Sequence, residues 1–81
     1  MNKTPPEAIY SLGDLVRVKE AIDFIEFGFT VNIGEVGVVV FIHPDDNEYV
    51  SLWGVDYMVL IRGRKLLFFE DELELVEKNK I

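Results

Sequence analysis

The chain contains no cysteine and only one histidine. Without thiols it cannot form disulfides or thiolate zinc sites, and one imidazole leaves little for a histidine-based metal site. No apolar run reaches the roughly 18 residues that a membrane-spanning helix needs. The first residues also lack the basic, apolar and small-residue regions of a secretory signal. We therefore expect a cytoplasmic protein with no membrane partner, no metal and no other cofactor.

Basic residues are scarce. Eight Lys and Arg stand against fifteen Asp and Glu, which gives a formal net charge of -7. Such a chain repels polyphosphate, and this argues against nucleic acid as a partner. The cations concentrate at Arg62, Arg64 and Lys65, with a smaller pair at Arg17 and Lys19. The first group could meet a phosphate or a carboxylate, or it could simply keep a turn soluble.

Motifs that carry catalytic chemistry are also missing. The glycines are scattered and form no phosphate-binding loop. The acidic stretches at residues 45–46 and 70–74 lack the spacing of a calcium-binding loop, and no base accompanies Ser11 or Ser51. Charged runs of this kind usually face water at turns. We predict no catalytic residues and no enzymatic activity.

The 81 residues are 49% hydrophobic and 12% aromatic, which predicts one folded domain with a packed core. Pro5 and Pro6 disfavour helix and favour an extended path, so residues 1–11 are predicted to form a flexible arm. The folded domain is predicted over residues 12–77. Residues 78–81 are predicted to form a polar tail.

The apolar pattern predicts strands rather than helices. Alternating or β-branched stretches occur at residues 15–19, 36–42, 57–61, 66–69 and 73–76. A long excursion over residues 20–33 follows the first strand, residues 62–65 have the length of a tight hairpin turn, and residues 70–72 form a three-residue turn. Five short strands in this order predict a small all-β barrel, because closure hides the sheet edges.

Three segments carry a resemblance to a known class of fold. They read GDLVRV at residues 13–18, GEVGVV at residues 34–39 and EDELELV at residues 70–76. On these segments the chain resembles the Src-homology-3-like (SH3-like) barrels, including small barrel proteins of tailed bacteriophages and the ferredoxin-docking small subunit of photosystem I. The resemblance implies a five-stranded SH3-like barrel with a single-turn 3-10 helix before the last strand.

Aromatic residues suggest where a partner could bind. Tyr49, Trp53 and Tyr57 surround the loop where peptide-binding relatives carry the aromatics of their ligand groove. Such side chains are typical of interfaces when exposed; alternatively, Trp53 closes the mouth of the barrel. Where the peptide-binding relatives have a proline, this chain has an acidic turn at residues 70–72, which argues against proline-rich ligands.

The excursion contains a second aromatic group, Phe24, Phe27 and Phe29. A barrel of this size has a limited interior. These rings therefore form either the contact surface of an oligomer or a satellite cluster packed under the loop.

The function predicted from the sequence is a non-enzymatic protein–protein interaction or assembly module, bound to another protein or to a second copy of itself. One alternative is a nucleic-acid-associated barrel of the KOW kind, with Arg17, Arg62, Arg64 and Lys65 as contacts. A second alternative is a redox-partner docking subunit, as the photosystem I resemblance implies, which needs a basic face toward an acidic ferredoxin.

Overall fold

The computed structural model describes residues 8–25, 28–43 and 55–80. Within these residues the chain forms β1 (Leu15–Val18), β2 (Ile22–Phe24), β3 (Phe29–Val31), β4 (Val36–His43), β5 (Asp56–Ile61), β6 (Arg64–Phe69), the 3-10 turn η2 (Glu70–Glu72) and β7 (Leu73–Glu77). The predicted all-β class, with a single 3-10 turn before the last strand, is confirmed. In this part of the chain no helix has the length and apolar character needed to cross a membrane.

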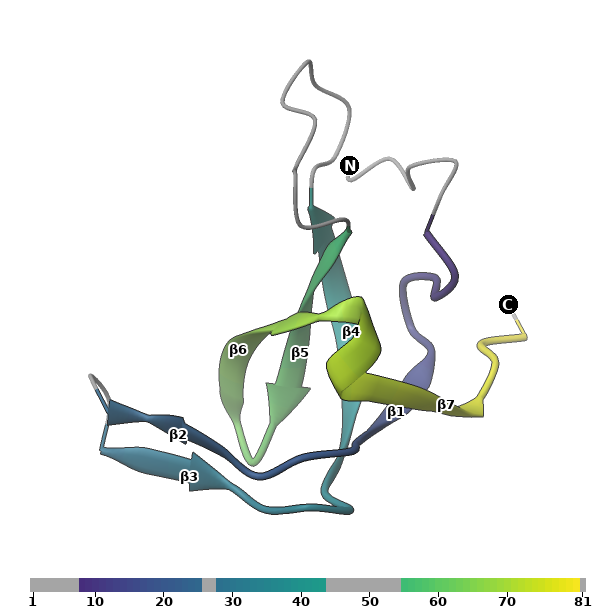
Figure 1. Ribbon diagram of the computed structural model, residues 1–81. Coiled ribbons are helices and arrows are strands. Elements are labelled where there is room, and N and C mark those ends of the chain that lie inside the picture. Colours follow the sequence, from purple (N-terminus) through teal and green to yellow (C-terminus); the bar gives the residue numbers. More distant parts are fainter. Residues whose placement is uncertain (1–7, 26–27, 44–54, 81) are drawn as a thin grey trace.

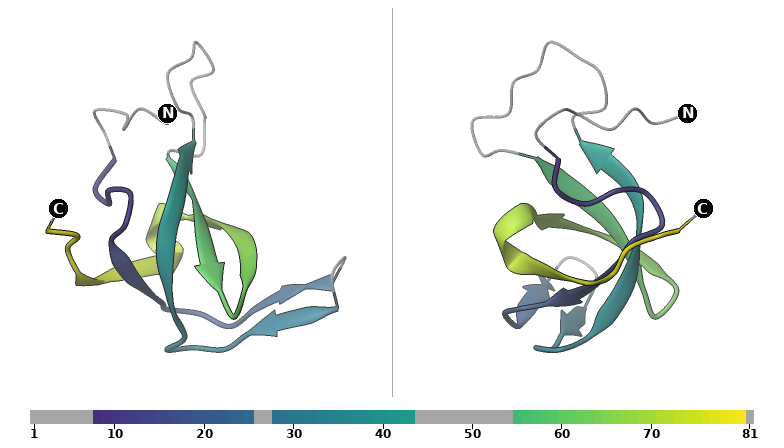
Figure 2. Two further views of the ribbon diagram at one scale, coloured as in Figure 1. Left: turned by 180° about the vertical axis from the view of Figure 1, so that it is seen from behind. Right: turned by 90° about the vertical axis from the view of Figure 1, so that its right-hand side faces the viewer.

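Five strands form one antiparallel sheet in the order β6-β5-β4-β1-β7, while β2 and β3 pair as a separate hairpin (Figure 1). β6 and β7 lie at opposite edges of this order, yet only the three residues of η2 connect them. The sheet must therefore curl until its two edges approach each other. Figure 2 shows this curvature and the β2–β3 hairpin extending away from the sheet.

The core lies inside the curled sheet. On β5 and β6 alternate residues face it, namely Tyr57, Val59, Ile61, Leu66 and Phe68. The core also includes Tyr10, Val16, Val18, Val31, Val39, Ile42, Val55 and Leu73. We call this side of the sheet the inner face.

A register shift in β4 changes which side chains face inward. Val39 pairs with Val59 and Phe41 pairs with Met58, so Val40 is an extra residue in β4. As a result Val39 and Ile42 are both buried although they lie three positions apart in the strand. Gly37 lies close to β5, where a Cβ atom would come within 2.6 Å of the Leu60 carbonyl oxygen. A side chain at residue 37 would therefore push the two strands apart.

The β5–β6 turn is tighter than the sequence predicts. Only Arg62 and Gly63 lie between the strands, with φ angles of 49° and 77°. Positive φ at both central residues is the requirement of a two-residue type I′ hairpin turn, and glycine meets it without strain. Arg64 and Lys65, predicted as turn residues, belong to β6.

The folded unit extends beyond the predicted limits of 12–77 at both ends. Tyr10 is only 5% exposed, and its hydroxyl donates a hydrogen bond to the carbonyl oxygen of Leu73 at 2.8 Å. Asn79 donates through its backbone N–H to Asp14 and through its side chain to Leu12. The end of the predicted arm and the start of the predicted tail are thus held against the sheet.

Candidate interaction surface

The strands β4, β5 and β6 also carry apolar residues on the side that points away from the core. We call this side the outer face. It consists of Val36, Val38, Val40, Phe41 and His43 from β4, Asp56, Met58 and Leu60 from β5, and Lys65, Leu67 and Phe69 from β6. The side chains of Leu67 and Phe69 are 47% and 45% exposed. Val36, Val40 and Leu60 are exposed as well.

The strand register makes the outer face continuous. Asp56 pairs with Phe69, Met58 with Leu67, and Leu60 with Lys65. On the other side of β5, the register pairs Asp56 with His43, Met58 with Phe41 and Leu60 with Val38. Opposite residues on one side of a sheet lie about 5 Å apart and touch. The outer face thus consists of three neighbouring rows of cross-strand residues, and apolar side chains occupy its centre.

The centre of the outer face is hollowed. A shallow depression of about 370 Å³ is lined by Val40, Phe41, Met58, Leu60 and Lys65. Isolated apolar side chains on a surface are ordinary, but a contiguous apolar patch usually marks an interaction site. A concave apolar centre can accept an apolar side chain from another molecule.

Three ionisable residues lie on the outer face. Lys65 lies at one end of the face, and His43 and Asp56 lie at the opposite end. Asp56 is half-buried, and its Oδ1 atom is buried with no hydrogen-bond partner among the described residues. Burial raises the pKa of Asp56, and the nearby His43 opposes that rise. A buried carboxylate oxygen without a donor is unfavourable for the charged form of the side chain.

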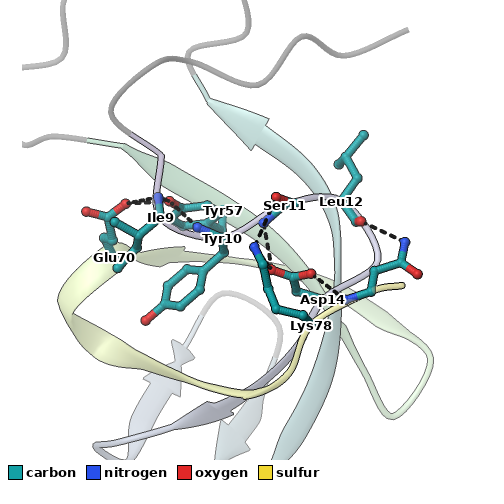
Figure 3. Close-up of polar contacts among 9 residues, drawn as sticks. Ile9, Tyr10, Ser11, Leu12, Asp14, Tyr57, Glu70 and Lys78 are labelled. Atoms are coloured by element: carbon teal, nitrogen blue, oxygen red, sulfur yellow. Dashed lines mark hydrogen bonds and ion pairs between the residues drawn. The ribbon is translucent and has the colours of Figure 1, made fainter. Parts of the chain in front are cut away.

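Tyr57 is a core residue, which corrects its prediction as an exposed contact. Its side chain is fully buried and its ring packs edge-on against Tyr10 at 5.0 Å. The hydroxyl accepts a hydrogen bond from the backbone N–H of Ile9 at 3.0 Å and donates one to Glu70 (Figure 3). Burial and the Glu70 carboxylate raise the pKa of Tyr57. The hydroxyl therefore joins the N-terminal segment to η2 and takes no part in an external contact.

The other predicted aromatic contacts divide into two groups. Tyr49, Trp53 and Phe27 lie outside the described residues. Phe24 and Phe29 are half-buried and pack against the core. The Phe24 ring packs edge-on against Phe68, with 5.7 Å between centroids.

The predicted basic group is divided among three places. Arg62 donates to both carboxylate oxygens of Glu35 and, at 2.7 Å, to the carbonyl oxygen of Thr30. The guanidinium groups of Arg62 and Arg64 lie 4.3 and 4.8 Å from the ring centroid of Phe29. These contacts fasten the β2–β3 hairpin to the β5–β6 turn.

The two remaining members of the predicted basic group lie elsewhere. Arg17 forms an ion pair of 3.0 Å with Glu74, on β1 and β7. Lys65 lies on the outer face beside Leu60. The four cations therefore do not form a single phosphate-binding surface.

Asp14 is a second buried carboxylate, and unlike Asp56 it is fully hydrogen-bonded (Figure 3). Its Oδ2 accepts from the Ser11 backbone N–H at 2.8 Å and from Lys78 Nζ at 3.3 Å, and its Oδ1 accepts from the Asn79 backbone N–H at 2.8 Å. Burial alone raises the pKa of Asp14, but these hydrogen bonds outweigh it and lower the pKa. The carboxylate therefore holds Ser11 and residues 78–79 together beside the start of β1.

Sequence reasoning missed the outer face, although the signal is in the sequence. The segments VGVVVFI, YMVLI and LLFF are apolar at both odd and even positions. A strand that is covered on one side only alternates between apolar and polar residues, whereas an unbroken apolar run indicates a strand covered on both sides. The core of this chain covers one side of these strands. The other side is the candidate interaction surface.

Within the described residues no group of three or more His, Asp and Glu side chains is placed to hold a metal ion. Comparisons with protein-family models, with curated proteins and with solved structures find no match to this chain.

Proposed function

We propose that this protein is a non-enzymatic protein–protein interaction module whose contact surface is the outer face of β4, β5 and β6. The observation that carries the proposal is the contiguous exposed apolar patch centred on Leu60 and Leu67. Covering such a patch releases ordered water and is favourable by about 25 cal/mol per Å² of apolar area. A protein partner supplies the apolar surface that this requires.

The character of the outer face favours protein over nucleic acid. A nucleic-acid interface is strongly cationic, because phosphate contacts supply most of the affinity. Lys65 is the one Lys or Arg on the outer face, and Arg62 and Arg17 already bind Glu35 and Glu74. The net charge of -7 acts in the same direction.

We also propose that the chain is an SH3-like barrel. Two features support this: the strand order β6-β5-β4-β1-β7, and the β2–β3 hairpin inserted between β1 and β4. A fold of this kind hosts many functions, so it positions the outer face without specifying the partner.

Site-specific photo-cross-linking tests the proposed function. A benzophenone amino acid replaces Leu67 on the outer face or, as a matched control, Leu75 on β7, which is 44% exposed. Both leucines lie on edge strands of the sheet. Each protein is irradiated alone and in an extract of the cells in which it naturally occurs. We expect a discrete adduct, with the protein itself or with another protein, from position 67 only.

Competition makes the test specific. Excess unlabelled wild-type protein should suppress the adduct, whereas unlabelled Leu60→Lys protein should not. Equal adducts from positions 67 and 75, or none from position 67 in either sample, would overturn the proposed function.

A further inference from the structure

We infer that the molecule covering the outer face is a second copy of this chain, related to the first by a two-fold axis. This inference rests on the proposed function and adds the identity of the partner. In a two-fold dimer the same patch occurs on both sides of the interface, so the patch must be complementary to itself. The outer face meets this condition in both shape and charge.

Opposite charges lie on the two sides of Met58. Asp56 lies two residues before Met58 on β5, and Leu60, the cross-strand partner of Lys65, lies two residues after it. A two-fold axis that crosses the strands at Met58 exchanges these two rows. The Lys65 end of one copy then lies over the Asp56 end of the other copy, and the same contact forms twice.

The position of Asp56 fits this arrangement. Its side chain is half-buried at one end of the outer face. The Lys65 ammonium carries three N–H donors on a flexible stem, and its aliphatic part already borders the apolar depression. In the dimer each Lys65 lies near the Asp56 carboxylate of the other copy.

The apolar rows between the charged ends also match. The two-fold axis places the central row, formed by Phe41, Met58 and Leu67, against the same row of the second copy. Methionine adapts to irregular surfaces, and Met58 lines the depression into which such a side chain can insert. A cluster of apolar side chains ringed by a few polar groups is the usual composition of a homodimer interface.

The net charge of the chain does not prevent this contact. Most of the acidic residues described for the C-terminal part lie on η2 and β7, beyond the outer face, and Glu74 is paired with Arg17. The outer face itself carries one lysine, one aspartate and one histidine. Two copies that meet through it do not bring like charges into contact.

The size of the face predicts a reversible dimer. Three strands about 4.8 Å apart and six residues long cover a footprint of roughly 15 by 20 Å. An interface of this size is smaller than those of most stable complexes and has the size of a weak, transient contact. We expect a dissociation constant in the micromolar range or weaker, so the measurement must reach high protein concentration.

Sedimentation equilibrium of the purified full chain, from about 10 μM to about 1 mM, tests the inference. The wild-type protein should shift from 9.3 kDa toward twice that mass. Leu67→Lys should weaken the dimer by at least about tenfold, because it places a charge in the desolvated centre. Leu75→Lys, the control of equal exposure outside the outer face, should leave the dissociation constant within about twofold.

A charge-reversal series tests the two-fold pairing. Lys65→Glu should weaken the dimer by about three- to tenfold, because it sets a glutamate against Asp56 at both ends. Lys80→Glu makes the same change in net charge on an exposed residue outside the face and should have little effect. The double variant Lys65→Glu/Asp56→Lys restores opposite charges and should recover most of the lost affinity. Circular dichroism checks that every variant is folded, and Lys65→Glu alone tests the pairing if Asp56→Lys does not fold.

The outcomes separate this inference from the proposed function. If the wild-type protein stays monomeric to the highest concentration, the inference that a second copy covers the outer face is overturned. The cross-linking at position 67 in the cell extract then tests the proposed function independently. A dimer that Leu67→Lys and Leu75→Lys weaken equally places the interface elsewhere and overturns the inference. A double variant no tighter than Lys65→Glu overturns the two-fold pairing.

Discussion

The inner and outer faces of β4, β5 and β6 have similar compositions but different surroundings. On β6, Leu66 is 2% exposed and its neighbour Leu67 is 47% exposed. On β5, Val59 is fully buried and Leu60 is 38% exposed. The side chains are equally apolar, so hydrophobicity alone does not determine which face forms the core. Instead, the curl of the sheet covers one face, while the other face stays exposed to solvent.

The carboxylates of Asp14 and Asp56 show the same contrast. Asp14 accepts hydrogen bonds from Ser11, Lys78 and Asn79, and these bonds join segments that lie far apart in the sequence. Asp56, at the end of the outer face, has a buried oxygen without a donor among the described residues. A carboxylate whose hydrogen bonds all form within the chain stabilises the fold, whereas a buried carboxylate oxygen without a donor is an exception that calls for an explanation.

The largest expected effect is the loss of stability when Leu66 is truncated, compared with truncation of its neighbour Leu67. Leu66→Ala should lower the free energy of unfolding by about 3 kcal/mol, because it leaves a cavity in the core. Leu67→Ala should lower it by less than about 1 kcal/mol, since half of that side chain already contacts water in the monomer. Urea denaturation at low micromolar protein concentration, where the monomer predominates, measures both values. Similar losses for the two variants would mean that the faces do not differ as described.

A smaller effect is expected from neutralising the two carboxylates. Asp14→Asn should cost about 2 kcal/mol at neutral pH, because both carboxylate oxygens accept N–H groups and the amide turns one acceptor into a donor. Asp56→Asn should be neutral or stabilising by up to about 1 kcal/mol, because it removes a charge from a buried position without a donor. Urea denaturation of the monomer compares them. A loss at Asp56 equal to that at Asp14 would remove the contrast.

The pH dependence of stability should have opposite signs at these two residues. The folded-state pKa of Asp14 is lowered, so its stabilising contribution is present above the ordinary value of about 3.9 and is lost as pH falls through the folded-state pKa. The folded-state pKa of Asp56 is raised, so its contribution is present below about 3.9 and is lost as pH rises through the folded-state pKa. The difference in unfolding free energy between wild type and Asp14→Asn should therefore rise with pH mainly below about pH 4, and the difference between wild type and Asp56→Asn should fall with pH mainly above about pH 4.

The sequence predicted the strands well because their local signals are strong. The β-branched run of β4 and the acidic turn of η2 formed as expected, whereas β2 and β3 formed within the predicted excursion. It could not place side chains whose role depends on partners far along the chain. Tyr57 is buried because Ile9 and Glu70 meet its hydroxyl, at sequence separations of 48 and 13 residues.

The candidate surface escaped prediction for a related reason. In a strand that is apolar at both odd and even positions, such as β5, alternation does not say which side faces the core. In β4 the extra residue Val40 also shifts the alternation within one strand. Only the assembled sheet, with its curl and its register, separates Leu60 and Leu67 from Val59 and Leu66.

The smallest expected effect concerns Arg62, which helps to close the inner face on the hairpin side. Arg62→Ala removes two hydrogen bonds to Glu35, one to Thr30 and the contact with the Phe29 ring. Because half of this side chain is exposed, solvent screens the ion pair, and the loss should be no more than about 1 kcal/mol. Alanine and arginine both carry a Cβ atom, so the positive φ at this residue adds little to the difference.

Hydrogen exchange locates the effect of Arg62→Ala more sharply than global unfolding does. Amides of β2 and β3 should exchange faster in the variant, while those of β4 and β5 keep their protection, since the lost contacts fasten only the hairpin. Arg62→Lys keeps the charge but cannot pair with both oxygens of Glu35, so it should give an intermediate result. Faster exchange across β5 as well would show that the hairpin supports the whole inner face, because the core would then open together with it.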